Sequence, residues 1–416
     1  MEPLNRKPFA GVLVLSTAAF CASPVLAQWP QFGGPNRDFT SPATGLAMEW
    51  PKGGPKTLWS RELGDGYSGI AVEDGVLYTL YNKDAQETVA ALDAENGKTL
   101  WEHAYSITLF PKMDPSFGAG PRSTPLIAGD RVYAVGLTGV LTALDRKTGK
   151  SVWSHDLVKE FDGTQPMWGY APSPLAHGST VIVAVGGPGH GLMAFNQADG
   201  TVAWSGGDSP NAYSSPILMS IGGREQLVLF NVRGVTGMNP DDGAVLWSYP
   251  HKTDWDVNAA LPVWCGDDTV FISSAYGSGS RLIKLTRDGD KTVAKEVWVQ
   301  PKMKVHFGSM IRIGDYVYGS SGDNAAVFFA GVNLKTGEMA FRERDKIAKA
   351  QFVYADGKLV IVDEDGNLAI GTVAPDGLTI HAKARLLDKI SWTSPTLCGT
   401  KVYLRDRKTI KAVDLG

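Results

Sequence analysis

Short runs of alternating apolar and polar residues recur along this chain, and a glycine-containing turn interrupts many of them. One phrase repeats with little change, as ALDAENGKTLW at 91–101, ALDRKTGKSVW at 143–153, AFNQADGTVAW at 194–204 and GMNPDDGAVLW at 237–247. More divergent copies lie at 284–298, 331–341 and 371–381. An apolar run, an Asp or Asn, a few polar residues, a Gly and a second run predict a β-hairpin whose Gly adopts a positive φ.

A second hairpin precedes each copy. It is clearest at 123–136, where Gly129 and Asp130 form the turn between two β-rich runs. Two hairpins give four strands in each unit, and units of about 40 to 50 residues with four strands are typical of β-propeller blades. Counterparts of this second hairpin begin at Ser173, Leu261, Met310, Phe352 and Ser394.

The repeat count predicts a closed ring. The last copy, at 409–416, has the first strand and its Asp but ends before the Trp, while TLWSREL at 57–63 supplies that missing strand with Trp59 in the Trp position. Pairing the two ends removes an exposed sheet edge. We therefore predict an all-β fold, an eight-bladed β-propeller of four-stranded antiparallel blades whose last blade is closed by N- and C-terminal strands. The predicted divisions are a signal peptide at 1–27, an extension packing on the propeller at 28–56, and the propeller at 57–416.

Six of the 12 tryptophans occupy the same position of the repeat. Each such side chain buries on the order of 150 to 250 Å², so regular spacing predicts packing between blades rather than chemistry. These residues are Trp59, Trp101, Trp153, Trp204, Trp247 and Trp298.

Two cysteines follow the predicted signal peptide, Cys265 and Cys398. They occupy equivalent places in repeats three apart, which a ring of eight holds farther apart than the Cα separation of about 7 Å that a disulfide tolerates. We predict two free, buried thiols.

Composition and charge narrow the class of protein. The chain has 416 residues, of which 43% are apolar and 20% charged, which excludes a disordered chain. The formal net charge is −3. A mildly acidic chain with no run of Lys and Arg lacks the electrostatic footprint of a nucleic-acid-binding protein, so we expect no nucleic-acid partner.

The N-terminus predicts export. Arg6 and Lys7 precede an apolar run at 9–22, and small residues follow up to Ala27. This order predicts a secretory signal peptide cleaved after Ala27, hence a periplasmic or secreted protein. The run is shorter than the ~20 residues of a membrane-spanning helix, and no comparable run follows, so we expect no transmembrane segment.

The repeated Ala-Leu-Asp, Thr-Gly and Trp elements resemble the pyrroloquinoline quinone (PQQ) repeat of quinoprotein dehydrogenases and the BamB-type outer-membrane assembly propeller. The phrases WPQFGGPNRD at 29–38, PRSTP at 121–125, GYAPSP at 169–174, AYSSP at 212–216, YGSGS at 276–280 and KISWTSP at 389–395 are similar to exported PQQ-like repeat proteins. The resemblance implies the propeller fold. The chain departs from the dehydrogenases because it has no two adjacent cysteines and no Cys-x-x-Cys-His motif that would attach a c-type haem.

The segments that enter the first strand of each blade are expected to surround one mouth of the ring. They are rich in aromatic, hydrogen-bonding and charged residues, and loops on a rigid scaffold commonly carry binding sites. The candidate site residues are Tyr67, Arg122, Trp168, Tyr170, Tyr213, Asp254, Trp255, Asp256, Asn258, His306, Lys349 and Trp392.

Several candidates have a structural alternative. Asp254, Asp256 and Asn258 provide oxygen ligands suited to Ca²⁺, or belong to a solvated loop. His306 is a proton carrier near neutral pH or a hydrogen-bonded structural residue. Arg122 either binds a carboxylate through two hydrogen bonds or links neighbouring blades.

Three functions remain open at this point. The favoured one is an exported binding or scaffold protein that takes a protein or small-molecule ligand at the mouth, requires no cofactor and is a monomer. The alternative is a dehydrogenase that uses PQQ with Ca²⁺ to oxidise an alcohol or sugar. The third is carbohydrate processing by paired carboxylates.

Overall fold

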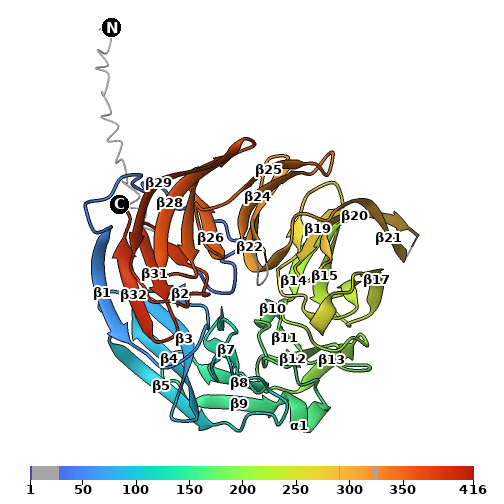
Figure 1. Cartoon of the computed structure of the whole chain (residues 1–416). Helices are drawn as coiled ribbons and strands as arrows, with labels where there is room; N and C mark the ends of the chain where they lie inside the picture. The colour runs from blue at the N-terminus through green and yellow to red at the C-terminus, as the bar shows by residue number, and fades with distance from the viewer. Residues whose placement is uncertain (2–27, 290, 323–326) are drawn as a thin grey trace.

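The computed structural model describes Met1 and residues 28–289, 291–322 and 327–416 (Figure 1). The predicted signal peptide lies outside these residues, apart from Met1. Within the described ranges, eight four-stranded antiparallel sheets surround a central axis. The predicted eight-bladed propeller is confirmed.

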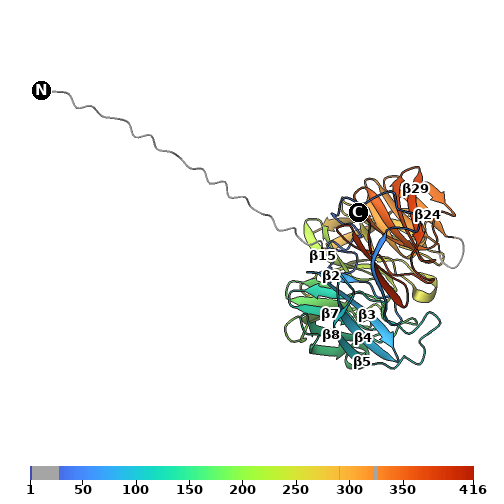
Figure 2. The ribbon, with the colours of Figure 1, turned by 90° about the vertical axis from the view of Figure 1, so that its left-hand side faces the viewer.

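Blades one to four follow one another along the chain, each running from the innermost strand to the outermost. They are β2 (Ala71–Glu73), β3 (Val76–Lys83), β4 (Gln86–Asp93), β5 (Thr99–Ser106); β6 (Leu126–Ala128), β7 (Arg131–Val135), β8 (Val140–Asp145), β9 (Ser151–Asp156); β10 (Leu175–His177), β11 (Thr180–Ala184), β12 (Leu192–Asn196), β13 (Val202–Gly206); and β14 (Ile217–Ile221), β15 (Arg224–Asn231), β16 (Gly234–Met238), β17 (Val245–Pro250). From the side, the first two of these blades stand next to each other (Figure 2).

Blades five to seven continue the same pattern. They are β18 (Val263–Trp264), β19 (Thr269–Ser274), β20 (Gly279–Asp288), β21 (Lys291–Gln300); β22 (Val305–Ile313), β23 (Tyr316–Ser321), β24 (Phe328–Asn333), β25 (Met339–Glu343); and β26 (Ala350–Ala355), β27 (Lys358–Asp363), β28 (Asn367–Ala374), β29 (Gly377–Arg385). Two short helical elements interrupt the described strands, α1 (Leu157–Phe161) and the 3₁₀ turn η1 (Asp254–Asp256).

The eighth blade joins the two ends of the chain. It combines β30 (Thr396–Cys398), β31 (Lys401–Arg405) and β32 (Thr409–Asp414) with β1 (Lys56–Glu62). Ser60 pairs with Lys411 across the antiparallel β1–β32 ladder, and Figure 1 shows the two strands side by side. The predicted closure is confirmed, because β1 satisfies the edge that β32 would otherwise expose.

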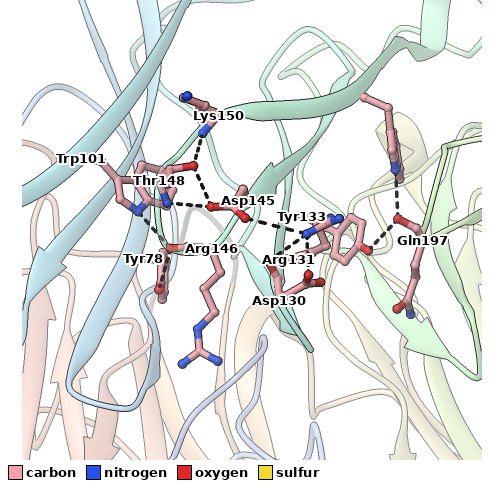
Figure 3. Close-up of polar contacts among 11 residues, drawn as sticks. Tyr78, Trp101, Asp130, Arg131, Tyr133, Asp145, Arg146, Thr148, Lys150 and Gln197 are labelled. Carbon is pink, nitrogen blue, oxygen red and sulfur yellow. Dashed lines mark hydrogen bonds and ion pairs between the residues drawn. The ribbon is translucent and has the colours of Figure 1, made fainter.

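The repeated tryptophans pack against the hairpin turn of the following blade (Figure 3). Trp101 Nε1 donates to the carbonyl oxygen of Arg146 at 3.0 Å. A Cβ added to Gly149 would lie 2.5 Å from the Trp101 ring, so only Gly fits there. The indoles of Trp59, Trp153, Trp204 and Trp298 make the same kind of bond to the next blade, to the carbonyls of Ala94, Gln197, Pro240 and Leu334.

Trp247 departs from this pattern. Its Nε1 donates to Gln226 Oε1 of the same blade at 2.7 Å. The blade that follows has the long hairpin β20–β21, so the short Asp–Gly turn that receives the other indoles is not available there.

The cysteines are unpaired, as predicted. Cys265 is buried and Cys398 is half-buried, so the prediction of burial is correct for the first and only partly correct for the second. Burial raises the pKa of both thiols to about 12, which keeps them protonated and unreactive near neutral pH.

Residues 29–47, which we call the strap, cross the ring on the far side from the mouth. Trp29 forms a β-bridge with Val72 of the first blade, and Thr40 forms one with Tyr354 of the seventh. Between them, Arg37 Nη1 donates to the carbonyl oxygen of Pro174 at 2.9 Å, in the third blade. Because the third and seventh blades are four apart in a ring of eight, the strap crosses from one side of the ring to the other.

Membrane insertion by a helix has no support in the part of the chain that the structure describes, since none of its helices is both long and apolar enough to span a bilayer.

Candidate functional site

A cavity of about 560 Å³ lies on the ring axis, and we call it the well. Residues from segments entering the innermost strands of all eight blades line it, and Phe32 of the strap lines it as well. The predicted candidates that line the well are Tyr67, Arg122, Trp168, Tyr213, His306, Lys349 and Trp392.

One wall of the well is a continuous set of aromatic rings centred on Trp392. Its ring stacks on Tyr67, with centroids 5.2 Å apart and an interplanar angle of 28°. Phe117 lies 5.3 Å and Phe307 5.1 Å from Trp392. His306 extends the wall, 4.7 Å from Phe307. Such a wall presents flat apolar faces to a ligand.

A second aromatic pair stands on the third and fourth blades. Trp168 lies 5.8 Å from Tyr213, and its Nε1 donates to Asp114 Oδ2 at 3.3 Å. Burial raises the pKa of Tyr213 to about 12, so its hydroxyl stays protonated. The pair therefore adds neutral aromatic surface to the well.

Arg122 supplies a half-buried positive charge. Its Nη1 donates to the carbonyl oxygen of Gly120 at 2.9 Å, and its guanidinium carbon lies 5.7 Å from the Tyr67 ring centroid. Burial lowers the pKa of Arg122. Among the described residues, no carboxylate lies within ion-pair distance of this guanidinium. A guanidinium without a directly paired carboxylate favours binding of an anion.

Two lysines and one carboxylate are the other charged side chains among the described residues that line the well. Lys349 Nζ lies 5.1 Å from the Phe307 ring centroid, and Lys389 pairs with Asp365 at 2.8 Å. The carboxylate of Glu364 accepts a hydrogen bond from Trp392 Nε1 at 3.1 Å. The described lining residues thus include three cationic side chains and one carboxylate.

Small hydroxyl residues of the Ser-Pro and Thr-Pro motifs tie the blades together below the aromatic wall. The Thr124 amide donates to Ser173 Oγ at 2.9 Å, and the Ser173 amide donates to Ser215 Oγ at 2.8 Å. These bonds join the second, third and fourth blades, which explains the repeated motifs as structural.

Two predicted site residues have structural roles away from the well. Tyr170 is fully buried, and its hydroxyl donates to the carbonyl oxygen of Val185 at 3.1 Å. Asn258 is also fully buried, and its Nδ2 donates to the carbonyl oxygen of Asn231 at 2.8 Å. Its Oδ1 accepts from Ser274 at 2.6 Å. Both side chains are occupied by internal hydrogen bonds.

The Asp254, Trp255 and Asp256 side chains do not line the well either. They form η1, where Trp255 is 69% exposed and has a φ of 66°. Across the described ranges, no group of three or more His, Cys, Asp or Glu side chains is arranged to hold a metal ion. Ca²⁺ takes six to eight oxygen ligands, and Glu364 is the one carboxylate among the described residues that line the well, so we derive no step through a Ca²⁺-bound quinone.

Several residues that line the well were not among those predicted from the sequence. Tyr276 lies in the β19–β20 connection and Glu364 in the β27–β28 connection. Because successive strands reverse direction, these connections open on the same face as the segments entering the first strand. That rule was available from the sequence, whereas the position of Phe32 depends on where the strap folds.

A family model described as outer membrane protein assembly factor BamB matches residues 85–343, more than half of the chain. The chain belongs to this family. This BamB-type propeller is also similar to individual quinoprotein dehydrogenases, to individual BamB proteins and to solved structures of the same fold.

Among the relatives, the chain is 33% identical to quinohemoprotein alcohol dehydrogenase ADH IIB of Pseudomonas putida over 135 residues, 32% of this chain and 18% of that protein. It is 36% identical to outer membrane protein assembly factor BamB of Xanthomonas campestris over 88 residues, 20% of this chain and 21% of that protein. The matches thus span about a fifth of each relative's length.

The crystal structure of BamB from Moraxella catarrhalis superimposes on this BamB-type propeller with a TM-score of 0.59 at 16% identity. The superposition covers 86% of this chain and 99% of that one. At this identity the likeness shows the fold alone.

Proposed function

We propose that this BamB-type propeller is an exported, monomeric binding protein whose ligand occupies the well. The observation that carries the proposal is Arg122, a half-buried guanidinium without a carboxylate partner within ion-pair distance among the described residues, which lines a cavity of about 560 Å³. That volume lies within the roughly 300–1,000 Å³ typical of ligand sites. The predicted signal peptide supports export, and the family supports a binding role.

The chemistry of the well favours a ligand with a flat apolar part and a negative group. The rings of Tyr67, Phe307 and Trp392 offer stacking surface. Arg122 has further N–H donors beyond those given to the Gly118 and Gly120 carbonyls. A carboxylate accepts from such a fork through two parallel bonds.

A matched pair of aromatic probes tests this chemistry. 2-Naphthoate and the neutral 2-naphthamide differ in charge and share the flat ring, and binding is followed by quenching of Trp fluorescence. We expect naphthoate to bind at least tenfold more tightly. Arg122→Gln should remove that difference, and Trp392→Ala should weaken both probes. Equal binding of the two probes to the wild type would contradict the proposal.

PQQ with and without Ca²⁺ separates the binding role from the dehydrogenase alternative. PQQ is a flat aromatic carboxylate, so it should raise the melting temperature by mass action. Because the described residues around the well lack a set of calcium ligands, Ca²⁺ should add no further stabilisation. A rise in melting temperature that depends on Ca²⁺ would favour the dehydrogenase.

A further inference from the structure

A second cavity of about 550 Å³ lies beside the well, and we call it the rim cavity. One of its sides is the connection between β5 and β6, and the other is α1 with the connection that follows it. It lies outside the predicted site and the repeats. Its lining residues are Phe110, Lys112, Met113, Val158, Asp162, Gly163, Gln165, Pro166 and Met167.

Hydrogen bonds fix the two sides of the rim cavity relative to each other. The Asp114 amide donates to the carbonyl oxygen of Met167 at 2.8 Å. The carboxylate of Asp114 in turn accepts from Trp168 Nε1 at 3.3 Å. On the other side, Asp156 caps α1 by accepting from the Lys159 amide at 3.0 Å. The cavity therefore has walls tied by hydrogen bonds rather than two unconnected loops.

Two consecutive residues line the rim cavity and the well. Met167 lines the rim cavity, and Trp168 lines the well. The same β5–β6 connection contributes Phe110 to the rim cavity and Phe117 to the well. The same two chain segments therefore line both cavities.

The two cavities differ in chemistry. The well presents Arg122, whereas the rim cavity presents the apolar side chains of Phe110, Val158 and Met167 beside the polar side chains of Lys112, Asp162 and Gln165. Met167 is 43% exposed, and methionine adapts its shape to varied apolar partners. An aliphatic or aromatic side chain suits the apolar part of this lining.

We propose that the rim cavity is a second subsite of the same ligand, and that the ligand is an extended segment of a partner protein. A carboxylate of this segment binds Arg122 in the well, and an apolar side chain occupies the rim cavity. This proposal rests on the proposed function. The combined volume supports a peptide, because the two cavities together exceed the ~1,000 Å³ upper range of small-molecule sites.

The test uses a library of displayed dodecapeptides with free C-termini, selected on the full-length protein. Peptides enriched on the wild type are expected to combine an acidic group with an apolar side chain at a constant spacing. Their affinity is then measured by fluorescence anisotropy. Met167→Glu places a charge in the rim cavity and should weaken binding at least tenfold. Truncated peptides that lack the apolar residue should bind wild type and Met167→Glu equally.

A matched control excludes a general effect of an added surface charge. Val202 is 45% exposed on the outer strand β13 and lines neither cavity, so Val202→Glu should bind like the wild type. Melting temperatures of both variants should equal that of the wild type, since both replaced side chains are solvent-exposed.

The outcomes separate this inference from the proposed function. If Met167→Glu binds the selected peptides as the wild type does while Arg122→Gln does not, the rim subsite is wrong and the well remains. Binding of naphthoate without enrichment of any peptide identifies a small-molecule ligand and overturns the inference alone. If neither naphthoate nor peptides bind, both proposals fail.

Discussion

The ring of Tyr67, which precedes the first blade, stacks on Trp392, which precedes the last, at a centroid distance of 5.2 Å. Thr393 Oγ1 also donates to the carbonyl oxygen of Tyr67 at 3.0 Å. The aromatic wall of the well is therefore assembled where the two ends of the chain close the ring. Ring closure and formation of the candidate site depend on the same contacts.

Trp392→Ala tests this dependence. The change removes ring contacts with Tyr67, Phe117 and Phe307. We expect a loss of about 1–2 kcal/mol in the free energy of unfolding, less than the roughly 3–5 kcal/mol of a fully buried Trp, because one side of the ring borders the well. The free energy of unfolding is measured by denaturation in urea. Trp392→Phe, which keeps an aromatic ring, should recover most of the stability.

Arg405→Leu tests the hydrogen bonds that Arg405 of the eighth blade makes to the first blade. Arg405 is buried, and its Nη1 donates to the carbonyl oxygen of Leu80 at 2.7 Å and to Thr79 Oγ1 at 3.0 Å. Leucine leaves these acceptors without a donor, so we expect a loss of about 3 kcal/mol. The urea midpoint should fall accordingly. An unchanged midpoint would mean that β1–β32 pairing alone holds the ring closed.

A pair of glycine variants tests the tryptophan–turn contact. Gly200 has a φ of 77°, and a Cβ there would lie 2.7 Å from the Trp153 ring. Gly129 has a φ of 58° and open space around it. Gly129→Ala should cost only the backbone strain of about 1–2 kcal/mol, whereas Gly200→Ala should cost clearly more because it also displaces the indole. Equal melting temperatures for the two variants would contradict the predicted packing role.

His251 should make stability depend on pH. Burial, with a smaller effect of Arg281, lowers the pKa of His251 to about 3 from its usual 6.5. Between these values the unfolded chain binds a proton that the folded chain does not. Stability is therefore lost as the pH falls from about 6.5 toward 3, at up to about 1.4 kcal/mol per pH unit.

His251→Gln isolates this contribution. The side-chain oxygen of the introduced glutamine replaces His251 Nδ1 as the acceptor for Arg281. In the wild type, Arg281 Nη1 lies 2.7 Å from His251 Nδ1. Burial raises the pKa of Glu87, which acts with the opposite sign because the folded state then binds the extra proton. Subtracting the stability curve of His251→Gln from that of the wild type cancels the contribution of Glu87 and of every other group that both proteins share. Parallel stability curves from pH 7 to pH 4 would show that His251 does not titrate as proposed.

The sequence determined the ring because its evidence is local and repeated. The Asp–Gly turns, the alternating strands and the Trp position each depend on neighbouring residues, and the incomplete last copy required a strand such as the one containing Trp59. The same regularity identified seven of the residues that line the well, since segments equivalent by repeat become neighbours in a ring.

Only the tertiary structure decided which side chains turn toward the axis. Tyr170 and Asn258 belong to segments of the mouth, yet buried carbonyl and hydroxyl groups pair with them. Phe32 reaches the well because the strap crosses from the third blade to the seventh, and no repeat encodes that path. Side-chain direction and long-range chain path depend on packing between distant segments, which local patterns do not specify.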